Sequence, residues 1–164
     1  MLSNSLRKKI GDVFEVSTSK GFAYFQYTHE YAKPPKWGSL IRVLQGFYKT
    51  RPQNEKLSEI VNQPHRFQIF LFLNHAIKEK EVFLVGNFAI PEFAQEFPIF
   101  KNTNTPPKGD HKEAIWSLWD GEKFWRVGKL TEKDQMKYPF LSLCDATALV
   151  KNIEDGAFFN SKFC

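Results

Sequence analysis

The first part of the chain alternates between hydrophobic and polar positions in a way that predicts a β-hairpin. Residues 11–16 have a strand pattern, residues 17–21 are suited to a polar turn, and residues 22–28 form the partner strand. Aromatic side chains fall on both faces of the second strand, with Phe22 and Tyr24 on one face and Phe25 and Tyr27 on the other. A strand that is apolar on both faces is covered twice, so we expect most of these rings to build a core.

A proline-rich loop and a change of period follow the hairpin. The stretch YAKPPKWGSL contains a Pro-Pro pair that excludes a helix, which predicts an exposed loop carrying Trp37. Residues 40–48 predict a strand in which Gly46 forms a bulge. Between two prolines, residues 53–63 place apolar side chains at i, i+3 and i+4, which predicts one short helix.

Two strongly apolar runs, RFQIFLFL and EVFLVGNF, flank the polar stretch NHAIKEK. This arrangement predicts a second hairpin with a longer loop. The first run is apolar on both faces, which is typical of a central strand in a sandwich or beneath a helix. The members of its two faces are Phe67, Ile69, Leu71 and Leu73 on one side and Phe70 and Phe72 on the other.

The last third of the chain predicts a helical turn, a loop, a hairpin and a final helix. The helical turn ends at Pro98, and residues 101–113 are polar and rich in turn formers, which predicts a surface loop. The stretch AIWSLWDGEKFWRVGKL predicts a hairpin around Asp120-Gly121. An amphipathic helix then begins after Asp145 as the N-cap and ends at Gly156.

These elements predict a mainly β (α+β) fold. We expect an antiparallel β barrel or sandwich with a C-terminal helix and one or two short helices, in which residues 1–164 form a single domain. The composition agrees, because 16% of the residues are aromatic and Phe alone accounts for 17 positions. Phe favours strands and cores.

The charge, the cysteine count and the lack of a signal or membrane segment favour the cytoplasm, but they do not identify a binding partner. The net charge is +5, and residues 1–60 carry the whole excess, which is also common on ordinary soluble proteins. The basic start is not followed by an apolar run, and no stretch has the length of a membrane-spanning helix. Two cysteines are too few for a disulfide framework. We therefore expect a cytoplasmic protein that does not enter a membrane.

The sequence assembles no catalytic or metal-binding set, so we expect no enzyme activity, no cofactor and no metal. None of the four histidines has metal-ligand spacing to another histidine or to a cysteine, and His111 lies in a polar loop. Cys144 lies ahead of a helix N-terminus, where a thiolate is stabilised, but its apolar neighbours indicate burial. The pairs Asp120/Glu122 and Glu132/Asp134 are explained by a turn and by capping from Thr131. An enzyme that uses Cys144 is the third alternative.

Nucleic-acid binding is a better alternative than catalysis. Strands that interleave basic and aromatic side chains can form a platform on which bases stack. The residues concerned are Arg7, Lys8, Lys9, Lys33, Lys36 and Arg42 among Tyr24, Tyr27, Tyr31 and Trp37. A charge of +5 is weak for this function, so we rank it second, as a nucleic-acid-binding β module.

Two segments together carry a family resemblance: KKIGDVFEV with GFAYFQY near the start, and WSLWDGEKFWRVGKLTEKDQMKYPFLSLCDATALVKNIEDG near the end. They resemble the immunity protein 26 family of bacterial polymorphic toxin and contact-dependent inhibition systems. The family motif is a Gly-Asp-x-Phe strand followed by an aromatic strand, and residues 50–110 have no counterpart. The resemblance implies a mostly β antidote without catalytic residues, which binds and neutralises a cognate protein toxin, often a nuclease.

The charge of this chain conflicts with a nuclease as the toxin. Antidotes to nucleases tend to be acidic, because the toxin surface that meets nucleic acid is basic. Three alternatives stay open: another kind of toxin, binding through acidic patches such as Glu92/Glu96 or Glu154/Asp155, or binding away from the active site.

The loop HEYAKPPKWG is the candidate docking segment, because Tyr, Trp and basic residues suit interface anchors. The alternative is that Trp37 folds under its own loop. The candidate partner-binding residues are Tyr27, Tyr31, Lys33, Lys36, Trp37 and Arg42. In the later hairpin, Trp116, Trp119 and Trp125 cannot all lie on one face, so we expect at least one to be exposed.

Overall fold

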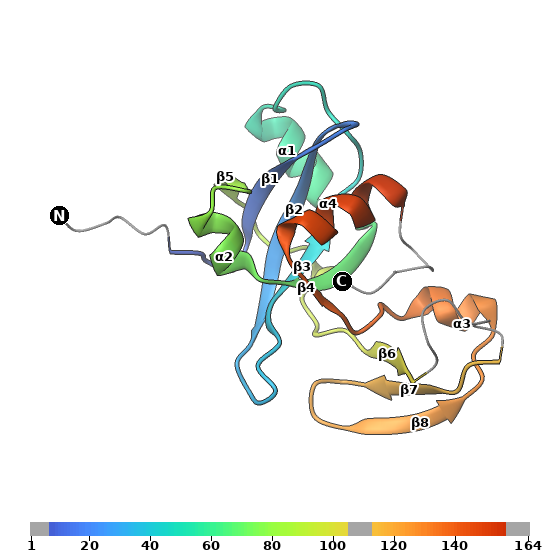
Figure 1. The fold of residues 1–164 in the computed structure, drawn as a ribbon. Helices are drawn as coiled ribbons and strands as arrows, with labels where there is room; N and C mark the ends of the chain where they lie inside the picture. Colours follow the sequence, from blue (N-terminus) through green and yellow to red (C-terminus); the bar gives the residue numbers. More distant parts are fainter. Residues whose placement is uncertain (1–6, 105–112, 157–164) are drawn as a thin grey trace.

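The computed structural model describes residues 7–104 and 113–156, and its fold is mainly β, as the sequence predicts. A six-stranded main sheet and a three-stranded second sheet are accompanied by helices, one of them C-terminal (Figure 1). The strands are β1 (Asp12–Thr18), β2 (Gly21–Tyr31), β3 (Gly38–Val43), β4 (Phe67–Leu71), β5 (Phe83–Asn87), β6 (Phe100–Thr103), β7 (Trp116–Trp119), β8 (Phe124–Gly128) and β9 (Leu143–Cys144). The helices are α1 (Asn54–Val61), α2 (Leu73–Lys78), η1 (Glu92–Ala94), α3 (Glu132–Lys137) and α4 (Ala146–Asp155). The main sheet has β5 and β9 at its two edges, so the fold is sandwich-like rather than a closed barrel.

The predicted first hairpin is confirmed as β1 and β2. Phe14 pairs with Phe25, and their rings stack at 5.4 Å within one core cluster. Glu15 pairs with Tyr24 on the opposite face, and the Tyr24 hydroxyl donates a hydrogen bond of 2.7 Å to the Glu15 carboxylate. The aromatic rings of β2 therefore serve two cores, one on each face of the sheet.

The strand predicted at residues 40–48 is shorter in the structure. β3 ends at Val43, and Gly46 has a φ of +91° in the connection beyond it rather than a bulge inside a strand. Tyr48 then returns to form an isolated bridge with Phe22. The chain leaves the sheet here and continues into α1, which packs on the sheet. This helix is confirmed within the predicted range.

The predicted hairpin between RFQIFLFL and EVFLVGNF is wrong. The strand order is β5-β1-β2-β3-β4-β9, so β4 and β5 lie far apart in the main sheet. The polar stretch between them forms α2, whose buried Leu73 and Ala76 belong to the same core as Phe14. β5 pairs with β1 and β4 pairs with β3, because the helix carries the chain across one face of the sheet.

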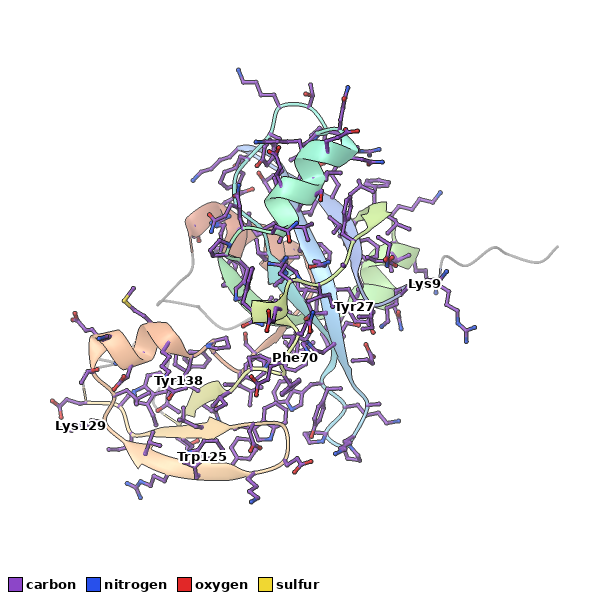
Figure 2. All side chains as sticks on the ribbon, turned by 180° about the vertical axis from the view of Figure 1, so that it is seen from behind. Lys9, Tyr27, Phe70, Trp125, Lys129 and Tyr138 are labelled. Atoms are coloured by element: carbon purple, nitrogen blue, oxygen red, sulfur yellow. The ribbon has the colours of Figure 1, made fainter. Side chains whose placement is uncertain are left out.

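Each face of the main sheet is covered, as expected for a strand with the pattern of β4. On one face, α2 and α4 pack on a core that includes Ile69 and Leu71. On the other face, α1 packs at one end, and the second sheet packs at the other end against Phe70. Figure 2 shows Phe70 at the junction between the two sheets.

The second sheet confirms the hairpin around Asp120-Gly121 as β7 and β8. β6 lies beside β7, and its residues 101–103 correct the start of the loop predicted at 101–113. Residues 105–112, with His111, fall outside the described residues. Phe100 and Trp119 of this sheet share a core cluster with Leu40 and Phe70 of the main sheet. This shared core joins the sheets, while a single domain over residues 1–164 stays a prediction.

The predicted caps of the C-terminal elements are confirmed. Asp145 accepts a hydrogen bond of 2.8 Å from the backbone N–H of Ala148 at the start of α4, and Gly156 ends that helix with a φ of +65°. Thr131 accepts a hydrogen bond of 3.1 Å from the N–H of Asp134 at the start of α3. No helix in the described part of the chain has the length and apolarity needed to cross a membrane.

Candidate docking surface

The structure divides the predicted partner-binding residues into accessible and buried groups. Lys33 and Lys36 are exposed in the loop after β2, while Tyr31 and Trp37 are half-buried. Tyr27 and Arg42 are 4% and 0% exposed and have no surface to offer a partner, which corrects the prediction for these two residues. A binding role for Tyr31, Lys33, Lys36 and Trp37 stays a prediction.

Arg42 is a structural residue that serves the end of α1. Its Nε donates a hydrogen bond of 2.9 Å to Oε1 of Gln26, and its Nη2 donates to the carbonyl oxygen of Val61, the last residue of the helix. Its Nη1 donates to Gln63 at 3.4 Å. The carbonyl groups at a helix C-terminus are unpaired and carry partial negative charge, so they can hold a buried cation. Burial lowers the pKa of Arg42 to about 10, and none of the described carboxylates forms an ion pair with it.

Tyr27 is buried in the main core with its hydroxyl committed. That hydroxyl donates a hydrogen bond of 2.6 Å to Glu30, and Lys8 lies over its ring at 5.2 Å. Burial, followed by the hydrogen bond to Glu30, raises the pKa of Tyr27 above its usual range. Because Tyr24 and Arg42 are also buried, the residues that indicated a nucleic-acid platform do not share one surface.

Trp37 does not fold under its own loop but packs across the junction of the two sheets. Its ring lies 5.6 Å from Phe70 of β4 and 6.2 Å from Trp119 of β7, measured between ring centroids. Part of the Trp37 side chain is therefore used to join the sheets and is not available to a partner.

A cleft of about 350 Å³ lies between the end of β2 and the turn that joins β7 to β8. Tyr31 closes one side, because its hydroxyl donates a hydrogen bond of 2.7 Å to the carbonyl oxygen of Gly121. Phe97 forms the inner wall and lies 5.9 Å from the Tyr31 ring. Phe97 was not among the predicted site residues. It follows η1, far along the chain from the loop after β2, and only the tertiary fold brings it to the cleft.

The rim of this cleft is acidic. Glu30, Asp120 and Glu122 line it, and Lys33 is the cation among its lining residues, 3.8 Å from Glu122. Asp120 accepts hydrogen bonds of 2.9 Å from the N–H groups of Lys123 and Glu122, which hold its pKa below the usual value. The local charge is thus opposite to the net charge of the chain.

Exposed aromatic residues continue from this turn along β8. Phe124 is 58% exposed and stacks on Trp119 at 5.7 Å, and Trp125 is 37% exposed. Trp116 and Trp119 are buried, so Trp125 is the exposed tryptophan of the hairpin (Figure 2). β8 pairs with β7 alone among the described strands, which leaves its other edge accessible. We call the cleft and β8 together the acidic–aromatic surface.

The other candidate chemistries find little support in the geometry. Cys144 is buried in the core between β9 and α4, as its apolar neighbours predict. Among residues 7–104 and 113–156, no group of three or more His, Cys, Asp or Glu side chains could hold a metal ion. The absence of enzyme activity, of a cofactor and of a metal stays a prediction.

No protein-family model, curated protein or solved structure matches this chain. The functional argument therefore depends on the acidic–aromatic surface and on the resemblance found in the sequence.

Proposed function

We propose that this protein is a cytoplasmic immunity protein, which binds a cognate protein toxin and neutralises it by forming a complex. The observation that supports this proposal is the acidic–aromatic surface, where an acidic cleft adjoins an exposed aromatic strand. Aromatic side chains supply much of the energy of protein interfaces, and rim charges select the partner. A toxin encoded beside the immunity gene is the expected partner.

The cleft offers an answer to the charge conflict. The whole chain carries +5, but the cleft has three carboxylates and one lysine among its lining residues. A basic side chain of a toxin can enter the cleft that Tyr31 and Phe97 line, with its charge against Glu122. A nuclease toxin, whose substrate-binding surface is basic, is therefore compatible with this antidote despite the net charge.

β8 supplies the apolar contact beside the cleft. Phe124 and Trp125 point to opposite faces of the strand, so a partner that covers the edge of β8 can contact both rings. The unpaired edge can also accept a strand from the partner through main-chain hydrogen bonds. The carboxylates of the cleft would select the partner, and the apolar contact area of β8 would supply binding energy.

The test is growth rescue of bacteria that express the product of the adjacent gene, combined with pull-down of the two proteins. Co-expression of this chain should restore growth, and Glu122→Lys should weaken the complex by about tenfold, because it places a cation against the basic group of the toxin. Glu113→Lys is the matched control, since it makes the same charge change at the other end of the hairpin, where Glu113 pairs with Lys129 at 2.7 Å.

Two outcomes would count against the proposal. Failure of the wild-type chain to rescue growth or to capture the toxin contradicts the immunity function. Rescue that survives both Glu122→Lys and Trp125→Ala retains the function but contradicts the acidic–aromatic surface as its site.

A further inference from the structure

A second cavity, on the other side of the junction between the sheets, has the opposite electrostatic character. It measures about 200 Å³ and lies where the start of β4 meets the segment after α3 and the end of α4. Arg66 and Lys137 line it, and none of the described residues in its lining is a carboxylate. The acidic–aromatic surface shares no residue with this cavity.

Arg66 is held in place with part of its hydrogen-bonding capacity unused. Its Nη2 donates a hydrogen bond of 2.8 Å to the carbonyl oxygen of Ile153, while its buried Nη1 has no hydrogen-bond partner among the described residues. The guanidinium lies over the rings of Phe47 and Phe67, at 5.4 and 5.9 Å from their centroids. The aromatic contacts restrict the guanidinium, so a ligand does not have to order it on binding.

The neighbouring polar groups add no charge to the cavity. Nδ1 of His65 is buried without a hydrogen-bond partner among the described residues, and burial, followed by the charge of Arg42, lowers the pKa of His65 to about 4. The imidazole is therefore neutral at neutral pH. Ser142 adds a hydroxyl group to the lining. The positive charge of the cavity comes from Arg66 and Lys137.

We propose that this cavity binds a small molecule through an oxyanion, either a carboxylate or a phosphate. A planar guanidinium matches the oxygen atoms of both groups, and a lysine at the same cavity adds charge. Phe67, Tyr138 and Phe140 surround the rest of the cavity, so the ligand is expected to carry a flat apolar part.

Calorimetric titration of the full chain with matched probes tests the charge requirement. Benzoate and phenyl phosphate should bind with saturation, while benzamide, which has the shape of benzoate without its charge, should bind at least tenfold more weakly. Inorganic phosphate should compete with both anions. Stronger binding of phenyl phosphate or of benzoate identifies which oxyanion the cavity prefers. Equal binding of benzamide and benzoate, or the lack of saturable binding by either anion at millimolar concentration, overturns the proposal.

Substitutions locate the site. Arg66→Met keeps an apolar stem against the phenylalanines and should weaken benzoate binding at least tenfold, and Ser142→Ala should weaken it severalfold. Lys151→Met is the control, because Lys151 is exposed on α4 next to Asn152 but outside the lining. If Arg66→Met does not fold, Lys137→Met removes a charge from an exposed position and should weaken binding instead. Unchanged affinity in a folded Arg66→Met or Lys137→Met variant contradicts the site.

Discussion

The hydroxyl of Tyr31 donates its hydrogen bond to Gly121 across 90 positions of sequence, and so joins β2 of the main sheet to the turn of the second sheet. The turn is tight, because Gly121 has a φ of +100° and a Cβ there would lie 3.1 Å from the ring of Phe97. The shape of the cleft therefore depends on both sheets, and it forms only when they are docked.

We expect Tyr31→Phe to lower the free energy of unfolding by about 0.5–1.5 kcal/mol, because the ring remains while the hydrogen bond is lost. Urea denaturation measures the change. Tyr48→Phe is the control, since its exposed hydroxyl makes only a 3.3 Å hydrogen bond to Gln45 and should matter less. A larger loss for Tyr48→Phe than for Tyr31→Phe would contradict the role given to Tyr31.

Arg42→Met should be strongly destabilising, by roughly 3–5 kcal/mol, because it leaves Gln26 and the end of α1 without their buried donor. The change is measured as a lower midpoint of chemical denaturation. Arg126→Met, on the exposed strand β8, removes the same charge and should change stability by less than about 0.5 kcal/mol. A mild effect of Arg42→Met would show that Arg42 is not the structural residue described above.

Stability should fall as the pH is lowered from 7.5 to 5, with His65 as one cause. The unfolded chain protonates His65 near its ordinary pKa of 6.5, whereas the folded protein does so only near 4. The contribution of the neutral imidazole is therefore complete above pH 6.5 and is lost as the pH falls towards 4. The expected loss down to pH 5 is on the order of 2 kcal/mol.

Denaturation at several pH values checks this expectation. His65→Gln should reduce the slope of stability against pH, and His75→Gln, at an exposed position of α2, should keep it. The range above pH 5 avoids the titration of Glu15. The hydrogen bond from Arg51 holds the pKa of Glu15 below its usual value of 4.5, so its contribution to stability is lost only at lower pH. An unchanged slope in His65→Gln would contradict the prediction.

Among the three tryptophans of the β7–β8 hairpin, Trp125 should be the one whose fluorescence acrylamide quenches most. It is 37% exposed, while Trp116 and Trp119 are 0% and 3% exposed. Trp125→Phe should lower the quenching constant, and Trp116→Phe, as the control, should not lower it. Binding of a partner to the acidic–aromatic surface should protect Trp125 from the quencher.

The sequence predicted those elements whose signals are local. Asp120-Gly121, Asp145 and Gly156 each fix a turn or a helix end through their own backbone geometry and hydrogen bonds, so the β7–β8 hairpin and α4 could be placed in advance. The two-sided core of β2 also follows from alternation alone.

The failures were non-local. Adjacent strand patterns favour a hairpin between β4 and β5, but β5 pairs with β1. The buried face of α2 consists of Leu73, the last residue of the apolar run, and Ala76 within the polar stretch, so no helical period stands out there. The charge of Arg42 led to the expectation of a surface position. That expectation failed because the partners of Arg42 are carbonyl groups at the end of α1, a helix that packs against it from a later part of the chain. The position of Phe97 in the cleft could not be predicted for the same reason, because no local sequence pattern indicates which distant loop a ring will contact.

The covering of the main sheet has a consequence for synthesis. Leu149 and Ile153 of α4 belong to the same core as Phe14 and Phe25 of the first hairpin. The ribosome delivers that hairpin long before α4, so the part of this face that α2 does not cover stays open until residues 146–155 emerge. During that interval apolar side chains of the first hairpin are exposed to aggregation.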